Sequence, residues 1–209
     1  MKGLYPLAVG VFGFFLILQS VHGDELDPRG LRSDNTEIRW NTVGQIVTQR
    51  RAIVEETLEI LKESRGATEI SGSCRAALRV LGALRAPEAV PELSKMVDAR
   101  LEETEADCFS ISGPTIGDRY PAAGVLAKIG KPAVAECLTR LGDFDPRRNE
   151  SRERYCWVIG EVEGPTVGRF VIEDRIRTET NPLRKKQLQA AHALFEKLFP
   201  VVDEETNKK

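Results

Sequence analysis

The chain has 209 residues, a formal net charge of −2 at pH 7, 41% hydrophobic and 30% charged side chains. A balance this close to neutral gives no reason to expect nucleic acid as the main partner. The length suits a single domain, even after the N-terminal segment described next is removed (209 minus 23 leaves 186 residues).

The first 23 residues have the pattern of a secretory signal peptide. Lys2 is followed by an uninterrupted apolar run over residues 7–18 and then by Val-His-Gly at residues 21–23. The alternative is an uncleaved membrane anchor, but a spanning helix needs about 20 apolar residues, and this run is shorter. We therefore expect cleavage after Gly23, a secreted or periplasmic protein, and no membrane association after cleavage.

Residues 24–38 are polar and lack periodicity, which predicts a flexible N-terminus of the mature chain. From Trp40 to Ser64 apolar side chains recur at helical spacing, which predicts one long amphipathic helix. The apolar positions are Val43, Val47, Val54, Leu58 and Leu61, widened by Ile46, Ile53 and Ile60. Residues 201–209 form a polar tail, so the helical domain is expected to cover residues 39–200.

A helix–turn–helix pattern then occurs three times, over about residues 74–103, 120–141 and 150–178. The first apolar stretch of each copy ends in Leu81-Gly82, Ile129-Gly130 or Ile159-Gly160, and the second is opened by Pro87, Pro132 or Pro165. Glycine permits the positive φ that stops a helix, and proline is tolerated in a helix's first turn. Asn181-Pro182 predicts the start of a last helix.

These copies predict an all-α protein. A helix pair with one apolar stripe cannot bury that stripe alone, so neighbouring pairs must stack. No segment alternates with period two, so no sheet is expected. The predicted fold is a short right-handed α-solenoid, a HEAT/armadillo-like superhelix of about seven helices.

The repeated residues resemble those of HEAT-like repeat proteins, the short-period variety also found in phycobilisome lyase subunits. The resemblance rests on ALRVLGAL with AVPEL, on VLAKIGKPAV, and on WVIGEVEGPTV, and it covers roughly residues 72–198. It implies the fold and a surface for interactions. It does not imply lyase activity, because no residue matches a lyase-specific motif.

Four cysteines follow the apolar run: Cys74, Cys108, Cys137 and Cys156. An even number in an exported chain suggests two disulfides, here Cys74 with Cys108 and Cys137 with Cys156, although four cysteines allow three connectivities. The alternative is four buried free thiols, because cysteine packs well as a small apolar residue. The spacings are wide and include no CxxC, so no metal site is expected.

Two features are candidates for binding. The stretch 109–117 is apolar and turn-rich and interrupts a repeat, and insertions in repeat proteins often lie on the binding face. Its candidate contacts are Phe109 and Ile111, the alternative being a loop packed back on the stack. Residues 146–154 concentrate Arg147, Arg148, Arg152 and Arg154. These side chains either form a basic rim for an anionic partner or lie on solvated helix faces with i,i+4 pairs.

Residues that could carry catalysis are few. His192 is the one histidine after residue 23, and it is interpreted as a structural side chain of the last helix. The five carboxylates of residues 98–107 lack the spacing of a calcium loop. No phosphate-binding glycine motif occurs, and no cofactor is expected.

The favoured interpretation is an exported, non-enzymatic helical-repeat scaffold or adaptor that binds a protein or an anionic polymer, with no nucleic acid as partner. The alternative is an extracellular or envelope enzyme, or an enzyme subunit, that uses grouped carboxylates and arginines. Convergent carboxylates with perturbed pKa values in a pocket would favour the enzyme.

Overall fold

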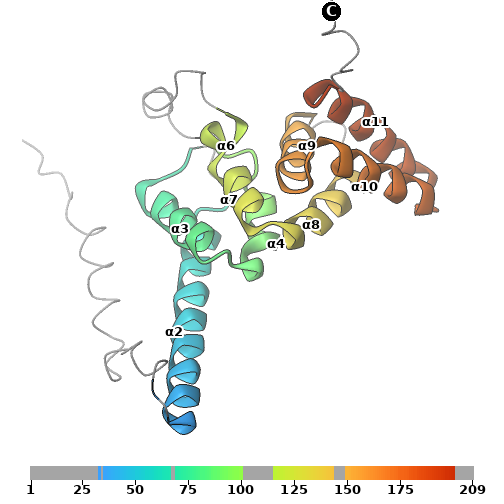
Figure 1. Ribbon diagram of the computed structural model, residues 1–209. Coiled ribbons are helices and arrows are strands. Elements are labelled where there is room, and N and C mark those ends of the chain that lie inside the picture. Colours follow the sequence, from blue (N-terminus) through green and yellow to red (C-terminus); the bar gives the residue numbers. More distant parts are fainter. Residues whose placement is uncertain (1–32, 34, 67–68, 101–114, 144–148, 201–209) are drawn as a thin grey trace, which may run out of the picture. The chain divides into compact units, whose positions relative to one another are not determined.

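The computed structural model describes residues 33, 35–66, 69–100, 115–143 and 149–200 (Figure 1). The chain divides into two units, Met1–Glu55 and Glu56–Lys209. The described residues form helices, and their only β-type pairing is an isolated bridge between Glu69 and Arg100. None of the described helices is long and apolar enough to cross a membrane.

The first described helix, α2 (Thr36–Glu63), is the long amphipathic helix that the periodicity predicts. It begins four residues earlier than Trp40, so the last residues of the polar 24–38 segment are helical. The side chain of Asn35 accepts the backbone N–H of Glu37 at 2.8 Å, which satisfies one donor of the helix start.

The first repeat consists of α3 (Gly72–Ala83), a 3-10 turn η2 (Pro87–Ala89) and α4 (Val90–Lys95). Ser71 caps α3 by accepting the N–H of Cys74 at 3.2 Å. The prediction that the second helix continues to about Glu103 was wrong, because α4 ends at Lys95. Val97 lies in a turn but is buried. Its apolar side chain therefore fits the helical spacing of the sequence although the helix has already ended.

The remaining helices follow the predicted order. They are α6 (Ile116–Arg119), α7 (Pro121–Ile129), α8 (Lys131–Gly142), α9 (Asn149–Glu163), α10 (Pro165–Thr178) and α11 (Pro182–Leu198). Prolines lie in the first turns of α8, α10 and α11, as expected, and Asn181 caps α11 by accepting two backbone N–H groups. The described residues hold nine α-helices instead of about seven. One that was not foreseen is α6, a single turn with a Thr115–Asp118 capping box.

Of the three repeated glycines, only Gly130 ends a helix, with φ +87°. The expectation that Gly82 and Gly160 do the same was wrong, because both lie inside helices. A Cβ at Gly160 would lie 2.2 Å from the ring of Phe199, so this glycine permits close packing. The residue that ends α9 is Gly164, with φ +78°.

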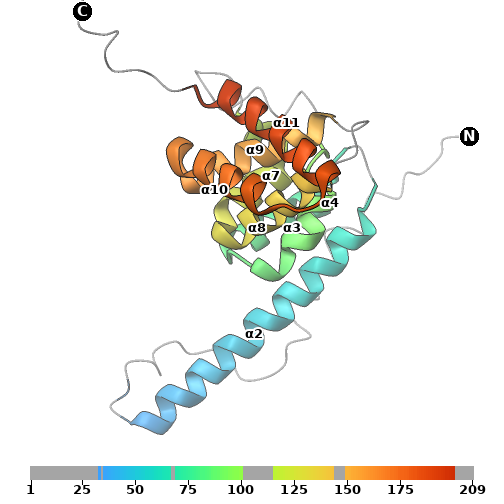
Figure 2. The same ribbon diagram turned by 90° about the vertical axis from the view of Figure 1, so that its right-hand side faces the viewer.

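Within the second unit the helices stack in sequence order (Figures 1 and 2). Helix α3 packs on α7, and α7 packs on α9, while α4 packs on α8. The third pair departs from this regular stacking: α8 packs against α9 and α11, and α10 packs against α9 and α11. Helix α11 thus lies beside α8, where a regular repeat would place α10. The protein is an all-α helical-repeat solenoid, and its right-handed sense stays a prediction.

The core lies between these helices. Its large, fully buried side chains come from α2 to α11 and include Leu61, Leu78, Leu81, Leu126, Leu141, Ile159, Ile172, Leu188 and Phe195. Each such side chain contributes about 1.5–3 kcal/mol by its removal from water. Ala77 of α3 and Ala122 and Ala123 of α7 are also fully buried. A larger side chain at any of these positions would have to be accommodated by the neighbouring helices.

Candidate functional site

The sequence-based binding residues are only partly described by the structure. Phe109, Ile111, Arg147 and Arg148 lie outside the described residues. Arg152 and Arg154 lie on α9, and both are engaged within the protein. A role in binding an anionic partner stays a prediction for this set.

Arg154 is the centre of a polar cluster that joins three repeats. Its side chain is only 2% exposed. Its Nη1 donates to Asp98 Oδ1 at 2.6 Å, and its Nη2 donates to Glu150 Oε2 at 3.2 Å. The guanidinium carbon lies 3.6 Å from the centroid of the Tyr120 ring, a stacked cation–π contact. Asp98 follows α4, Tyr120 precedes α7 and Arg154 belongs to α9.

Neighbouring groups complete this Arg154 cluster. The Ser151 hydroxyl donates to Asp98. Arg100 donates to Glu150 at 3.0 Å, and its guanidinium carbon lies 5.5 Å from the Tyr120 centroid. Hydrogen bonds from Arg154 and Arg100, and then their positive charges, lower the pKa of Glu150. The carboxylate is therefore ionised at neutral pH, where both ion pairs exist.

A second polar row joins α4, α8 and α9. The Tyr155 hydroxyl donates to the Ser94 carbonyl at 2.7 Å inside the core, and burial raises the pKa of Tyr155. The Ser94 hydroxyl contacts Glu136 at 3.1 Å, and Glu136 also accepts from Arg140 at 2.8 Å. These contacts leave the tyrosine protonated and fix the three helices relative to one another.

Arg152 faces the last helix. Its Nη2 donates to Gln187 Oε1 at 2.6 Å and thereby joins α9 to α11. Burial lowers the pKa of Arg152 from its ordinary value. Together, Arg152 and Arg154 connect α9 to the elements on both sides of it.

The described cysteines Cys74, Cys137 and Cys156 are buried free thiols, and Cys108 lies outside the described residues. Burial raises the pKa of all three thiols, and negative charge on Cys156 would raise that of Cys137 further. Cys156 also donates to the Ala191 carbonyl at 3.4 Å. The predicted Cys137–Cys156 disulfide is not formed in the structure, and the Cys74–Cys108 pairing stays a prediction.

His192 lies between two carboxylates of α10 and α11. Its Nε2 is 3.1 Å from Glu173 Oε1 and its Nδ1 is 3.8 Å from Glu196 Oε2, with the side chain 20% exposed. These contacts fit the structural interpretation of this histidine. Across the part of the chain that the structure describes, no three histidine, cysteine or acidic side chains are grouped to hold a metal ion.

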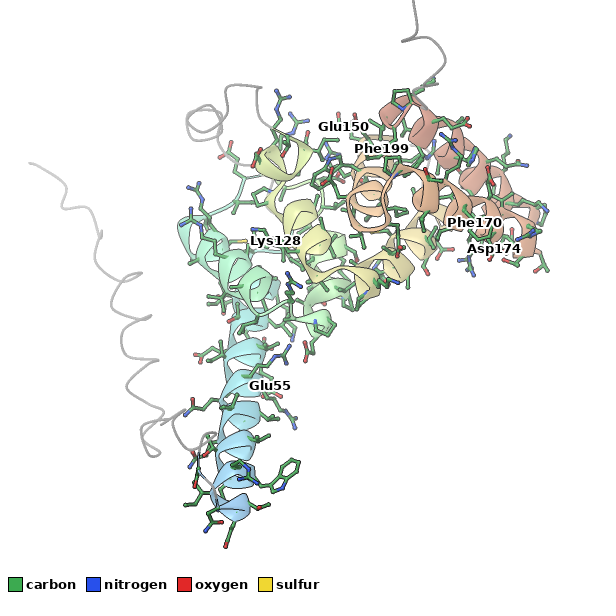
Figure 3. The ribbon with its side chains drawn as sticks, viewed as in Figure 1. Glu55, Lys128, Glu150, Phe170, Asp174 and Phe199 are labelled. Carbon is green, nitrogen blue, oxygen red and sulfur yellow. The ribbon has the colours of Figure 1, made fainter. Side chains whose placement is uncertain are left out.

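An exposed apolar pair on α10 was missed by the sequence reasoning. Val167 is 48% exposed and Phe170 is 60% exposed, one helical turn apart. Figure 3 shows Phe170 and Asp174 projecting from α10, and Arg177 pairs with Asp174 beyond them. The signal in the sequence was their position opposite Gly168 and Ile172, the buried side of the helix. We call Val167, Phe170 and the Asp174–Arg177 pair the α10 face.

Residues 74–98 match the family model of the PBS lyase HEAT-like repeat. The predicted HEAT-like repeat is thereby confirmed for this segment of the chain. The matched segment contains α3 from Cys74 onward, η2 and α4, and it ends at Asp98. This HEAT-like repeat therefore supplies the carboxylate that pairs with Arg154. No curated protein and no solved structure matches the chain.

Proposed function

We propose that the protein is an exported, non-enzymatic scaffold that binds a protein partner through the α10 face. The observation that carries this proposal is the exposure of Val167 and Phe170, at 48% and 60%, on a helix of a HEAT-like repeat stack. Aromatic side chains are enriched at the centres of protein interfaces, and charged pairs are typical of their rims.

The surrounding chemistry supports a scaffold. The polar side chains of the Arg154 cluster and of the Tyr155–Ser94 contact point at one another across repeats. Such contacts fix the repeats in one arrangement, as a binding surface requires. Arg154, at 2% exposure, serves this frame, whereas Phe170 is available to a partner.

The partner is a protein in this proposal because the α10 face is apolar and its Asp174–Arg177 rim carries both charges. An anionic polymer would instead be recognised by a surface with several positively charged arginine side chains. Arg147 and Arg148 supply such charge in the sequence, and together with Phe109 and Ile111 they form a proposed secondary contact. The pattern of residues 1–23 supports export.

Affinity capture from the native extracellular fraction tests the binding face. The bait is the secreted protein, and the test variant carries Val167→Asp and Phe170→Asp. We expect this variant to lose its partner, because two charges replace the apolar centre of the interface. The control is Leu183→Asp, which introduces one such charge at a side chain that is 66% exposed near the start of α11.

Two further variants and one sequencing measurement separate the proposals. If Arg147→Glu with Arg148→Glu abolishes partner binding and the α10-face variant still binds, then the binding site lies in the basic segment and not on α10. Binding through that segment should weaken with salt. An enzymatic turnover that His192→Ala abolishes would overturn the proposal of a non-enzymatic scaffold. N-terminal sequencing of the secreted protein tests export, with Asp24 the expected first residue.

A further inference from the structure

One apolar stripe runs along the whole of α2, but only its second half is buried. Its members Trp40, Val47, Val54 and Leu61 are spaced seven residues apart and so lie on one side of the helix. Val54 and Leu61 are 2% and 1% exposed, whereas Trp40 and Val47 are 69% and 59% exposed. The first half of α2 therefore exposes large apolar side chains, whereas the equivalent side chains of its second half are buried.

The period of this stripe indicates what kind of surface covers it. Apolar doublets recur every seven residues, as Ile46-Val47, Ile53-Val54 and Ile60-Leu61. A seven-residue repeat keeps apolar side chains facing a neighbouring helix that coils around the first one. A helix that lies on a flat lipid surface needs only apolar side chains that recur with the 3.6-residue period of the helix. The expected occupant is therefore another helix.

The charges along α2 indicate that this helix is a second copy of α2. Arg39, Arg50 and Arg51 lie in the exposed half, and Glu55 and Glu56 follow them. Arg39 and Glu55 lie eight residues on either side of Val47. In an antiparallel pair centred on Val47, each Arg39 is level with Glu55 of the other copy, and each Trp40 lies near the other copy's Ile53, which is 44% exposed. A parallel pair would instead align Arg50 with Arg50.

We propose that the first half of α2, residues 36–55, mediates self-association as an antiparallel two-helix contact between two copies of the chain. Such a contact is self-complementary, because the same residues serve both copies under two-fold symmetry. The two Val47 side chains form its apolar centre, and one Trp40 side chain lies toward each end. Glu55 projects from α2 (Figure 3), and its exposed pair with Arg51, at 2.7 Å, lies at the edge of the proposed contact.

Sedimentation equilibrium of the full chain tests self-association. We expect a concentration-dependent dimer, and we expect Val47→Glu to raise its dissociation constant at least about tenfold, because a charge would be buried without a partner. The matched control is Gln45→Glu, which adds the same charge to an exposed position on the opposite side of α2. Circular dichroism verifies that both variants keep their helix content. A wild-type protein that stays monomeric, or a dimer that Val47→Glu leaves unchanged, overturns the proposal.

Cross-linking tests the orientation. In a Cys108→Ser background, Val47→Cys should form a disulfide-linked dimer on mild oxidation, because the two Val47 positions meet at the centre. Trp40→Cys should not, because an antiparallel pair separates its two copies by about fourteen residues of helix, or about 20 Å. Efficient cross-linking through Trp40→Cys overturns the antiparallel arrangement. If the protein is monomeric and binds vesicles of anionic lipid, and Val47→Glu abolishes this binding, then a membrane surface covers the stripe and a second copy does not.

Discussion

The guanidinium of Arg154 is stacked at 3.6 Å on the ring of Tyr120 while its Nη1 donates to Asp98 at 2.6 Å. One side chain of the third repeat thus contacts the start of the second repeat and the end of the first. In a solenoid, each repeat ordinarily contacts only its neighbours. The Arg154 cluster adds a connection across three repeats and should make their unfolding more cooperative.

Replacing Arg154 should therefore be costly. Arg154→Met keeps much of the packing volume but leaves Asp98 without its buried partner, and we expect the free energy of unfolding to fall by about 2 kcal/mol, less than for a fully buried pair because Asp98 is half-exposed. Arg100→Met is the control, since Arg100 contacts the same Glu150 but is 56% exposed, and it should cost about 0.5 kcal/mol or less. Urea unfolding measures both. Equal effects of the two variants would contradict the special position of Arg154.

The close packing at Gly168 predicts a size limit. A Cβ there would lie 2.7 Å from Phe195 Cζ and 3.3 Å from Ile159, both in the buried core. We expect Gly168→Ala to destabilise the protein by about 1–3 kcal/mol, although alanine favours a helix. Gly44→Ala makes the same change in α2, where nothing lies within 4 Å of the added group, and it should be neutral or stabilising. A stabilised Gly168→Ala variant in thermal unfolding would show that Phe195 moves aside easily.

The buried thiols predict a pattern of protection. Because burial raises the pKa of Cys74, Cys137 and Cys156, few of these groups are thiolates at neutral pH, and the thiolate is the reactive form. In the reduced native protein, iodoacetamide should modify them far more slowly than in urea. Rapid native labelling of any of the three would argue against their buried positions.

Protein recovered from an extracellular fraction allows the remaining disulfide prediction to be tested. Non-reducing peptide mapping should reveal Cys74 with Cys108 if the export route oxidises the chain, whereas Cys137 and Cys156 should be free thiols, as in the structure. Free thiols throughout the secreted protein would end that prediction.

Acid should weaken the contact around Glu92. Burial by itself raises the pKa of Glu92, but hydrogen bonds and positive charges from Lys95 and Arg65 outweigh it, and the folded pKa lies below the ordinary 4.5. A lowered folded pKa stabilises the native state above the unfolded pKa, and that contribution is lost as pH falls through the folded value. The melting temperature difference between the wild type and Glu92→Gln should therefore shrink from about pH 6 to about pH 3. A difference independent of pH would contradict this role.

The helical repeats could be predicted from local signals in the sequence. Pro132, Pro165 and Asn181 mark helix starts wherever they occur, because their effect depends on their own backbone and on the next few residues. The spacing of Leu78, Leu81 and similar residues identifies the buried side of each helix. For that reason the all-α class, the order of the helices and the resemblance to HEAT-like repeats follow from the chain alone.

Other features depend on contacts between distant residues, and only the tertiary structure decided them. Gly82 and Gly160 resemble Gly130 in sequence but serve close helix packing, because Val125 and Phe199 lie against them. Arg154 belongs to a charged segment with the composition of a solvated face. It is buried because Asp98 and Tyr120, 56 and 34 residues earlier in the chain, reach it through the stacking of the repeats. Local sequence specifies φ, ψ and amphipathic period, whereas burial and pairing depend on which surfaces meet.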